Sequence, residues 1–129
     1  MSAESEMVEA IRAAIGAHGV WKLRLKTAIS LGRSEFSADE ACHDDRCEFG
    51  KWLKGAAIPN AVRQSPQFKD ISRRHGEFHR SAGYILGLAL SGHKAEATAK
   101  LDGDFTNLSQ GLTMAMRQWS QALTTGKAA

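Results

Sequence analysis

Three histidines and one cysteine are the side chains in this sequence whose types and spacing best suit metal chemistry. His75 and His79 are four residues apart, a spacing that puts two imidazoles on one side of a helix about 6 Å apart, where one metal ion can bridge them. The spacing alone also fits two partly exposed histidines, or two core histidines bonded to the backbone. The pair becomes a candidate site only if further ligands can reach it.

His18 supplies such a ligand from another part of the chain. It lies in the middle of an apolar series with helical steps of four and three, formed by Met7, Ile11, Ala14, His18, Trp21, Leu25 and Ala28. An imidazole on such a face must find a polar partner or a metal, since leaving it unpaired costs about 1 to 3 kcal/mol. Cys47 lies in the segment that must cross the bundle. Three imidazoles and one thiolate make a closed tetrahedral set suited to Zn²⁺.

The elements that would position these ligands are helices. The sequence contains only two prolines, and apolar residues recur at helical spacing over three long stretches, so we predict an all-α fold. The second stretch begins with Ser65 as N-cap and Pro66 at the first helical position, and its inward face is formed by Phe68, Ile71, His75, Phe78, Ala82, Ile85 and Ala89. The third follows a break at Ser91-Gly92 and comprises Leu101, Phe105, Leu108, Leu112, Ala115 and Trp119. This third series contains no metal-ligand residue.

The segment between the first and second long helices, from Gly32 to Asn60, is rich in turn residues. It holds two capping-box patterns, Ser37-Ala-Asp-Glu40 and Asp45-Arg-Cys-Glu48, which predict one or two short helices. If Asp45 caps the second of these, Cys47 falls in the first helical turn, where unpaired N–H groups and the helix dipole favour a thiolate.

Length and composition favour one soluble globular domain. We predict a single domain over residues 1–129 with its core at about 5–123, and a short tail from Thr124 to Ala129. Hydrophobic residues make up 43% and charged residues 24% of the chain, which is ordinary for a folded domain. The formal charge is only +3 and the 17 Lys and Arg residues are spread along the chain, so nucleic-acid and membrane binding have little support.

The N-terminus and the two cysteines bear on the compartment. The first six residues are acidic where a secretory signal is basic and then apolar, and no apolar run approaches the roughly 18 residues that span a bilayer. We therefore expect a cytoplasmic protein. Cys42 and Cys47 could form a disulfide, but a reducing cytosol argues against it, and metal ligation or a reactive thiol is the better expectation for at least one of them.

Several segments together resemble a known family. His18-Gly-Val-Trp21, then Cys47-Glu-Phe-Gly-Lys-Trp52-Leu, then His75-Gly-Glu-Phe-His79 are similar in order and spacing to the signature of the chemoreceptor zinc-binding domain, also called CZB. The combination of HxxW, CxFGxW and, after 22 intervening residues, HxxxH is far more specific than any one piece.

The resemblance implies both a site and a fold. It implies that His18, Cys47, His75 and His79 are ligands of one zinc ion. The expected fold is a four-helix bundle with one or two short extra helices between the first and second long helices, and the family commonly forms a two-fold homodimer. Such domains are usually attached to a chemoreceptor signalling domain or a diguanylate cyclase. Neither is recognisable in this sequence, so we expect action in trans on a separate chemoreceptor or cyclase.

Other residues of the motif and two further histidines have expected roles. Trp21, Phe49 and Trp52 would form an apolar wall around the ion, and Gly50 would let the backbone pass close to a neighbouring helix, although plain core packing explains all of them equally well. Cys42 and His43 precede the motif cysteine in a polar loop and are not expected to be ligands. His93 follows Gly92 at a turn and is expected to be solvated or to cap a helix.

The closed ligand set bears on function. Four protein ligands leave no position for a bound water, and the sequence lacks a nucleophile triad, a phosphate-binding loop and a dinucleotide fingerprint, so we do not expect an enzyme. A single thiolate can be protonated or oxidised, which favours a sensor of zinc or of hypochlorous acid that regulates chemotaxis or cyclic-di-GMP synthesis, as the resemblance also implies. One alternative is a purely structural zinc module. Another, a hemerythrin-like di-iron protein, would need more histidines and inward carboxylates.

Overall fold

The computed structural model describes residues 3–125, and these form an all-α helical bundle, which confirms the predicted fold class. The part of the predicted tail at 126–129 lies outside the described residues. The described elements are α1 (Ala3–Gly19), α2 (Trp21–Leu31), α3 (Ala38–Cys42), α4 (Glu48–Lys54), α5 (Asn60–Arg63), α6 (Pro66–Leu90), α7 (Lys94–Lys100), a π-helical turn η1 (Leu101–Phe105) and α8 (Thr106–Thr124). No helix among the described residues is both long and apolar enough to span a membrane.

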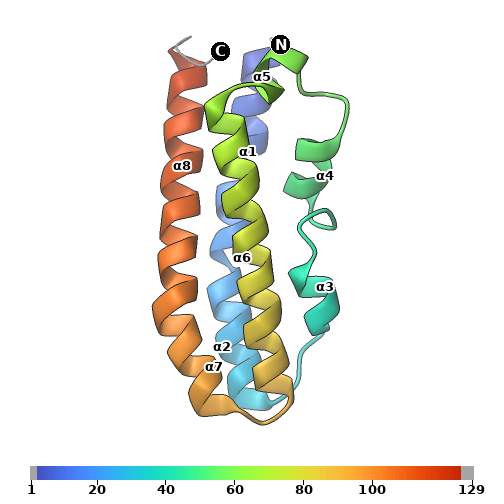
Figure 1. The fold of residues 1–129 in the computed structure, drawn as a ribbon, viewed down its shortest axis with the longest axis vertical. Helices are drawn as coiled ribbons and strands as arrows, with labels where there is room; N and C mark the ends of the chain where they lie inside the picture. The colour runs from blue at the N-terminus through green and yellow to red at the C-terminus, as the bar shows by residue number, and fades with distance from the viewer. Residues whose placement is uncertain (1–2, 126–129) are drawn as a thin grey trace.

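Three long columns of helix and one column of short helices make up the bundle (Figure 1). The α1–α2 column runs down behind, α6 runs down in front, and α7 with α8 returns upward beside them, so that both ends of the described chain lie at the top. The fourth column consists of α3 and α4, and α3 packs along α6 while α4 contacts α1. Within residues 32–65 three short helices occur rather than one or two, because Asn60–Arg63 adds a single turn before α6.

The helix boundaries differ from the sequence-based prediction at two points. The first apolar series is not one helix, since α1 ends at Gly19 and α2 begins at Trp21, although Trp21, Leu25 and Ala28 stay buried. The third series begins inside η1, where Leu101 and Phe105 are buried, and the buried positions of α8 are Leu112, Met116, Trp119, Ser120 and Leu123. The predicted Leu108 and Ala115 are only half-buried.

The N-cap residues of α3, α4 and α6 agree with the sequence-based prediction in two of three cases. Ser37 and Glu40 form the predicted capping box, with both reciprocal hydrogen bonds at 3.0 and 3.2 Å. The second predicted box is wrong: α4 begins later, at Glu48, and its N-cap is Cys47 instead of Asp45. The backbone of Asp44 lies close against Gly50, in the first turn of α4. Ser65 caps α6 as predicted, accepting from the N–H of Phe68 at 3.3 Å.

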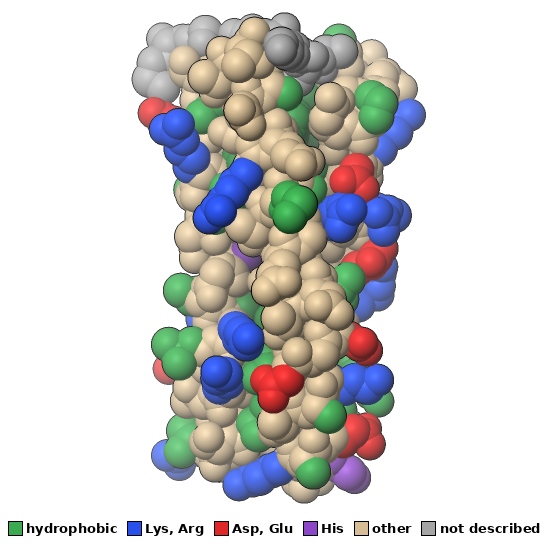
Figure 2. Space-filling view, turned by 90° about the vertical axis from the view of Figure 1, so that its left-hand side faces the viewer, with side chains coloured by type: hydrophobic (Ala, Val, Ile, Leu, Met, Phe, Trp, Pro, Cys, Tyr) green, Lys and Arg blue, Asp and Glu red, His purple; other side chains and the backbone are tan. Residues whose placement is uncertain are grey.

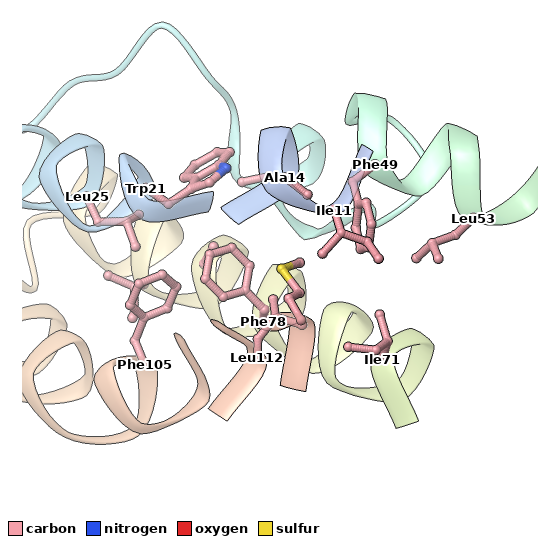
Figure 3. Packing of buried hydrophobic residues seen from close by; sticks show 14 of the residues in the cluster. Ile11, Ala14, Trp21, Leu25, Phe49, Leu53, Ile71, Phe78, Phe105 and Leu112 are labelled. Carbon is pink, nitrogen blue, oxygen red and sulfur yellow. The ribbon is translucent and has the colours of Figure 1, made fainter. Parts of the chain in front are cut away.

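The core extends along the bundle axis. Figure 3 shows Phe78 in the middle of the packing, between Trp21 and Ala14 on one side and Phe105 and Leu112 on the other. Phe78 and Phe105 are completely buried, and their ring centroids are 4.9 Å apart. The core therefore surrounds the level of the bundle at which the histidines lie.

On the surface, Lys and Arg side chains are scattered over the face seen in Figure 2 and do not form one large patch there.

Candidate metal centre

Four side chains from three elements meet at one level of the bundle. His18 lies in the last turn of α1, His75 and His79 lie on successive turns of α6, and Cys47 is the N-cap of α4. Each offers one donor atom, and the four donor atoms all lie within 4.8 Å of one another. All three histidines are buried and Cys47 is half-buried. The structure thus brings together the four residues proposed from the sequence.

The donor atoms have the spacing of one coordination shell. His75 Nε2 lies 3.0 Å from His18 Nε2, 3.1 Å from His79 Nε2 and 3.3 Å from Cys47 Sγ. Cys47 Sγ lies 4.0 Å from His18 Nε2. In a tetrahedral zinc site, bonds of about 2.05 Å to nitrogen and about 2.3 Å to sulfur put neighbouring donors about 3.3 to 3.6 Å apart. The distances from His75 Nε2 to the other three donors therefore lie close to those of a tetrahedral shell.

The outer nitrogens of two rings determine which atoms face the centre. His18 Nδ1 donates to the carbonyl of Ala14 at 2.7 Å, and His79 Nδ1 donates to the carbonyl of Ala41 at 3.0 Å. A carbonyl only accepts, so Nδ1 carries the proton and Nε2 of each neutral ring presents a lone pair inward. Bonds of this kind orient metal-ligating histidines. Lone pairs that converge on one buried point repel one another unless a cation lies between them, so the donor set fits a metal ion.

Electrostatics keep these histidines neutral. Burial lowers the pKa of His18 to about 4, against which its bond to Ala14 acts weakly. Burial, reinforced by repulsion from His79 and His18, lowers the pKa of His75 to about 3. Burial also lowers the pKa of His79. Neutral imidazoles are the form that binds metal, so protons do not compete for these sites near neutral pH.

Cys47 differs from the expectation based on the helix dipole. Burial raises the pKa of its thiol, and this outweighs the N–H groups of Gly50 and Phe49, which lower it. The N–H of Gly50 donates to Sγ at 3.3 Å. In the protein alone desolvation outweighs the helix N-terminus, so the thiol stays protonated near neutral pH and the positive charge of a metal ion would favour the thiolate.

The predicted surrounding residues take different places. The Phe49 ring lies edge-on to His75 and His18, with centroids 5.2 and 5.9 Å apart, and the Trp21 ring lies 6.2 Å from His79. Trp52 stacks on the outer side of Phe49 at 5.7 Å and contacts Trp119 instead of the ligands. The apolar wall therefore has Phe49 and Trp21 next to the rings and Trp52 behind them.

Two neighbours of the centre were not anticipated from the sequence. Phe78 lies 5.1 Å from His18 and 5.5 Å from His79, and the inward apolar face of α6 contained the signal that could have identified it. Asp44 is held by Lys54 at 2.8 Å, and its negative charge acts on His75 and His79. Its proximity depends on the fold of the loop before α4, so no spacing rule points to it.

The other cysteine and histidines lie outside this centre. Cys42 ends α3, His43 caps its C-terminus, and His93 precedes α7 next to Ser91. Cys42 and Cys47 are both free, so they do not form a disulfide.

Comparison with protein families gives a decisive match. The family model described as the chemoreceptor zinc-binding domain matches residues 18–86, more than half of the 129 residues. The chain belongs to this family. The matched range begins at His18 and contains all four residues that are positioned to coordinate one metal ion, so zinc is the cofactor of this chemoreceptor zinc-binding domain. Neither the curated proteins nor the solved structures contain a match.

Acid should destabilise this chemoreceptor zinc-binding domain after removal of metal by a chelator. The folded-state pKa values of about 4 for His18 and about 3 for His75 lie below the ordinary 6.5, so the unfolded chain binds more protons between these values. The free energy of unfolding is therefore not reduced by these two histidines above about pH 6.5. Below that pH it falls by about 1.4 kcal/mol per pH unit for each histidine. Urea unfolding followed by circular dichroism should show a clearly lower midpoint at pH 5 than at pH 7.5. An unchanged midpoint would mean that the rings are not held neutral.

Proposed function

We propose that this chemoreceptor zinc-binding domain is a cytoplasmic regulatory domain that binds one zinc ion and responds to zinc availability or to hypochlorous acid through Cys47. The observation that supports this most strongly is the convergence of the Nε2 atoms of three buried imidazoles and one thiol at one level of the bundle, with the thiol supplied by the N-cap of a short helix. When bound, zinc stabilises the Cys47 thiolate and completes a closed tetrahedral set. With no open position, the set favours regulation over catalysis.

Cys47 is the ligand through which an oxidant would act. A cavity of about 410 Å³ is lined by Cys47, His18 and His79 and by exposed residues such as Glu48, so a small molecule can reach the sulfur. Hypochlorous acid transfers its oxygen to the thiolate, giving a sulfenic acid and chloride, in a reaction that conserves both atoms and charge. A sulfenic acid is a poorer metal ligand than a thiolate, so oxidation would weaken zinc binding.

The position of Cys47 links the centre to a helix that can shift. The other three ligands lie on the long helices α1 and α6, whereas Cys47 caps α4, which has only seven residues. Phe49 on α4 packs against His18 and His75, so α4 would move together with Cys47 relative to the histidines. Loss of the bond from Cys47 would therefore release α4 from the long helices, and such a shift can be read at the surface.

The output and the partners belong to the proposal as well. We propose that the domain forms a homodimer and acts in trans on a separate chemoreceptor or diguanylate cyclase, in chemotaxis or cyclic-di-GMP signalling. The competing account is a structural module in which zinc only stabilises the fold. The two accounts differ in whether the protein can lose its zinc and remain folded.

The test is zinc retention under oxidation. Protein purified without added metal should contain about one zinc per chain, and a stoichiometric dose of hypochlorous acid should release it together with loss of the Cys47 thiol, because the thiolate is the ligand that is oxidised most readily. Helicity measured by circular dichroism should persist. Zinc is measured by atomic emission, and the thiol by mass spectrometry of alkylated peptides.

Cys42→Ser is the matched control, because it removes the other thiol of the chain and leaves the four ligands intact. It should release zinc as the unmodified protein does, whereas Cys47→Ala should bind zinc poorly before any oxidant is added. Zinc retained after complete oxidation of Cys47, or zinc loss accompanied by unfolding, would favour the structural module. Absence of zinc from the purified protein would contradict the proposal altogether.

A further inference from the structure

A second group of ligand-type side chains lies on the short helix α3 and its C-cap. Asp39, Cys42 and His43 each offer one donor atom, and these atoms lie within 4.8 Å of one another. None of them belongs to the buried centre. The group combines a thiol, an imidazole and a carboxylate, which are the three kinds of side chain that bind zinc in proteins.

The local geometry holds these three residues on one turn. His43 Nε2 lies 3.4 Å from Asp39 Oδ1, and Cys42 Sγ donates to the backbone carbonyl of Asp39 at 3.1 Å. The other carboxylate oxygen of Asp39 faces Arg46 at 3.9 Å, which leaves Oδ1 turned toward the imidazole. The capping box of Ser37 fixes the start of this helix.

Packing against α6 fixes the turn in the tertiary structure. A Cβ atom at Gly83 would lie 2.5 Å from Cys42 Cβ and 2.9 Å from the carbonyl of Ala38, so only glycine at this position lets α3 approach so closely. The group is therefore anchored on its inner side and open on its outer side, where the side chains of Asp39 and His43 are 76% and 42% exposed.

We propose that Asp39, Cys42 and His43 form a second Zn²⁺ site, open and exchangeable, on the surface of the domain. Three protein ligands leave a coordination position for water, unlike the closed set of the buried centre. Exposed ligands also exchange metal more easily, so this site should bind zinc more weakly than the buried one. Binding requires loss of the Cys42 proton, which is released to solvent.

The second site lies next to the route into the buried centre. His43 lines the cavity of about 410 Å³ that also reaches His18, Cys47 and His79. Ala41, one residue before Cys42, accepts the hydrogen bond that orients His79. The two sites thus border the same cavity but share no ligand. The second site does not depend on the regulatory function proposed above.

Cobalt provides the test, because a thiolate bound to Co²⁺ gives a charge-transfer absorption that zinc does not. The full chain is first loaded with one equivalent of zinc, desalted, and checked for one bound zinc, which tests the buried centre separately. It is then titrated with Co²⁺ while released zinc is followed with a coloured chelator. We expect a charge-transfer band that saturates near one equivalent of cobalt, without release of zinc.

Two variants and a control assign the band. Cys42→Ser should abolish it, and His43→Ala should weaken cobalt binding by at least about 10-fold, since even outer-shell partners of metal ligands contribute 10- to 100-fold. His93→Ala, which removes a histidine outside this group of donor atoms, should leave the titration unchanged. Absence of the band, its persistence in Cys42→Ser, or release of one zinc per cobalt bound would each overturn the proposal.

Discussion

Replacing His75 by alanine is expected to abolish tight zinc binding while the helical content persists. His75 Nε2 is the donor that lies closest to the other three, at 3.0, 3.1 and 3.3 Å, so its loss opens the shell on every side. We expect the zinc affinity to fall by more than about 100-fold, since loss of an outer-shell partner alone costs 10- to 100-fold. Competition with a chelator of known affinity measures the change.

The control for this prediction is His93→Ala. His93 lies before α7 beside Ser91, so its removal tests whether the loss of any histidine lowers the affinity. His79→Ala should behave like His75→Ala, because both rings supply an inward Nε2. Circular dichroism must show folded protein for each variant. Folded His75→Ala that binds zinc within a few-fold of the original affinity would remove His75 from the ligand set.

Replacing Gly50 by alanine is expected to cause the largest loss of stability and to weaken zinc binding at the same time. A Cβ at this position would lie 1.6 Å from the carbonyl oxygen of Asp44, which is backbone and cannot rotate away. Overpacking typically costs 1 to 3 kcal/mol, and a clash this close should cost about 3 kcal/mol or more. The midpoint of thermal unfolding should fall by about 10 °C or more.

The effect on zinc follows from the same backbone contact. The N–H of Gly50 donates to Cys47 Sγ at 3.3 Å, so a displaced α4 carries the thiol away from the histidines. Gly16→Ala is the matched control, because Gly16 is exposed near the C-terminal end of α1 and an added Cβ meets nothing within 4 Å. Alanine there should raise stability by about 0.5 to 1 kcal/mol. A Gly50→Ala protein as stable as the original would mean that the loop before α4 is not packed as described.

The first prediction concerns the histidine ligands and the second concerns Cys47, which Gly50 holds in place. The sequence identified these ligands in different ways. His18 and His75 stand on apolar faces of regular helices, and a periodic pattern predicts which way such side chains point. His79 follows from its position one turn beyond His75. Cys47 has no periodic pattern, and it was singled out by ligand chemistry and by the resemblance to a family motif.

Several features of the site depend on contacts between distant segments. The N-cap of α4 is Cys47 instead of Asp45, and the backbone of Asp44 packs against Gly50 in the first turn of this helix. Burial then raises the pKa of the Cys47 thiol, whereas the local helix signal predicted the opposite. Desolvation depends on every segment that covers a group, so it cannot be read from neighbours in sequence.

By itself the sequence determined the all-α class, the apolar faces, two of the caps and the set of residues suited to zinc, since each depends on local spacing or on side-chain chemistry. Only the tertiary structure decided the fourth column formed by α3 and α4, the π-turn before α8, and the carbonyls that orient His18 and His79. In particular, the carbonyl of Ala41 reaches His79 from 38 residues away, because α3 packs on α6. Contacts at that separation arise from packing between elements, which no local pattern encodes.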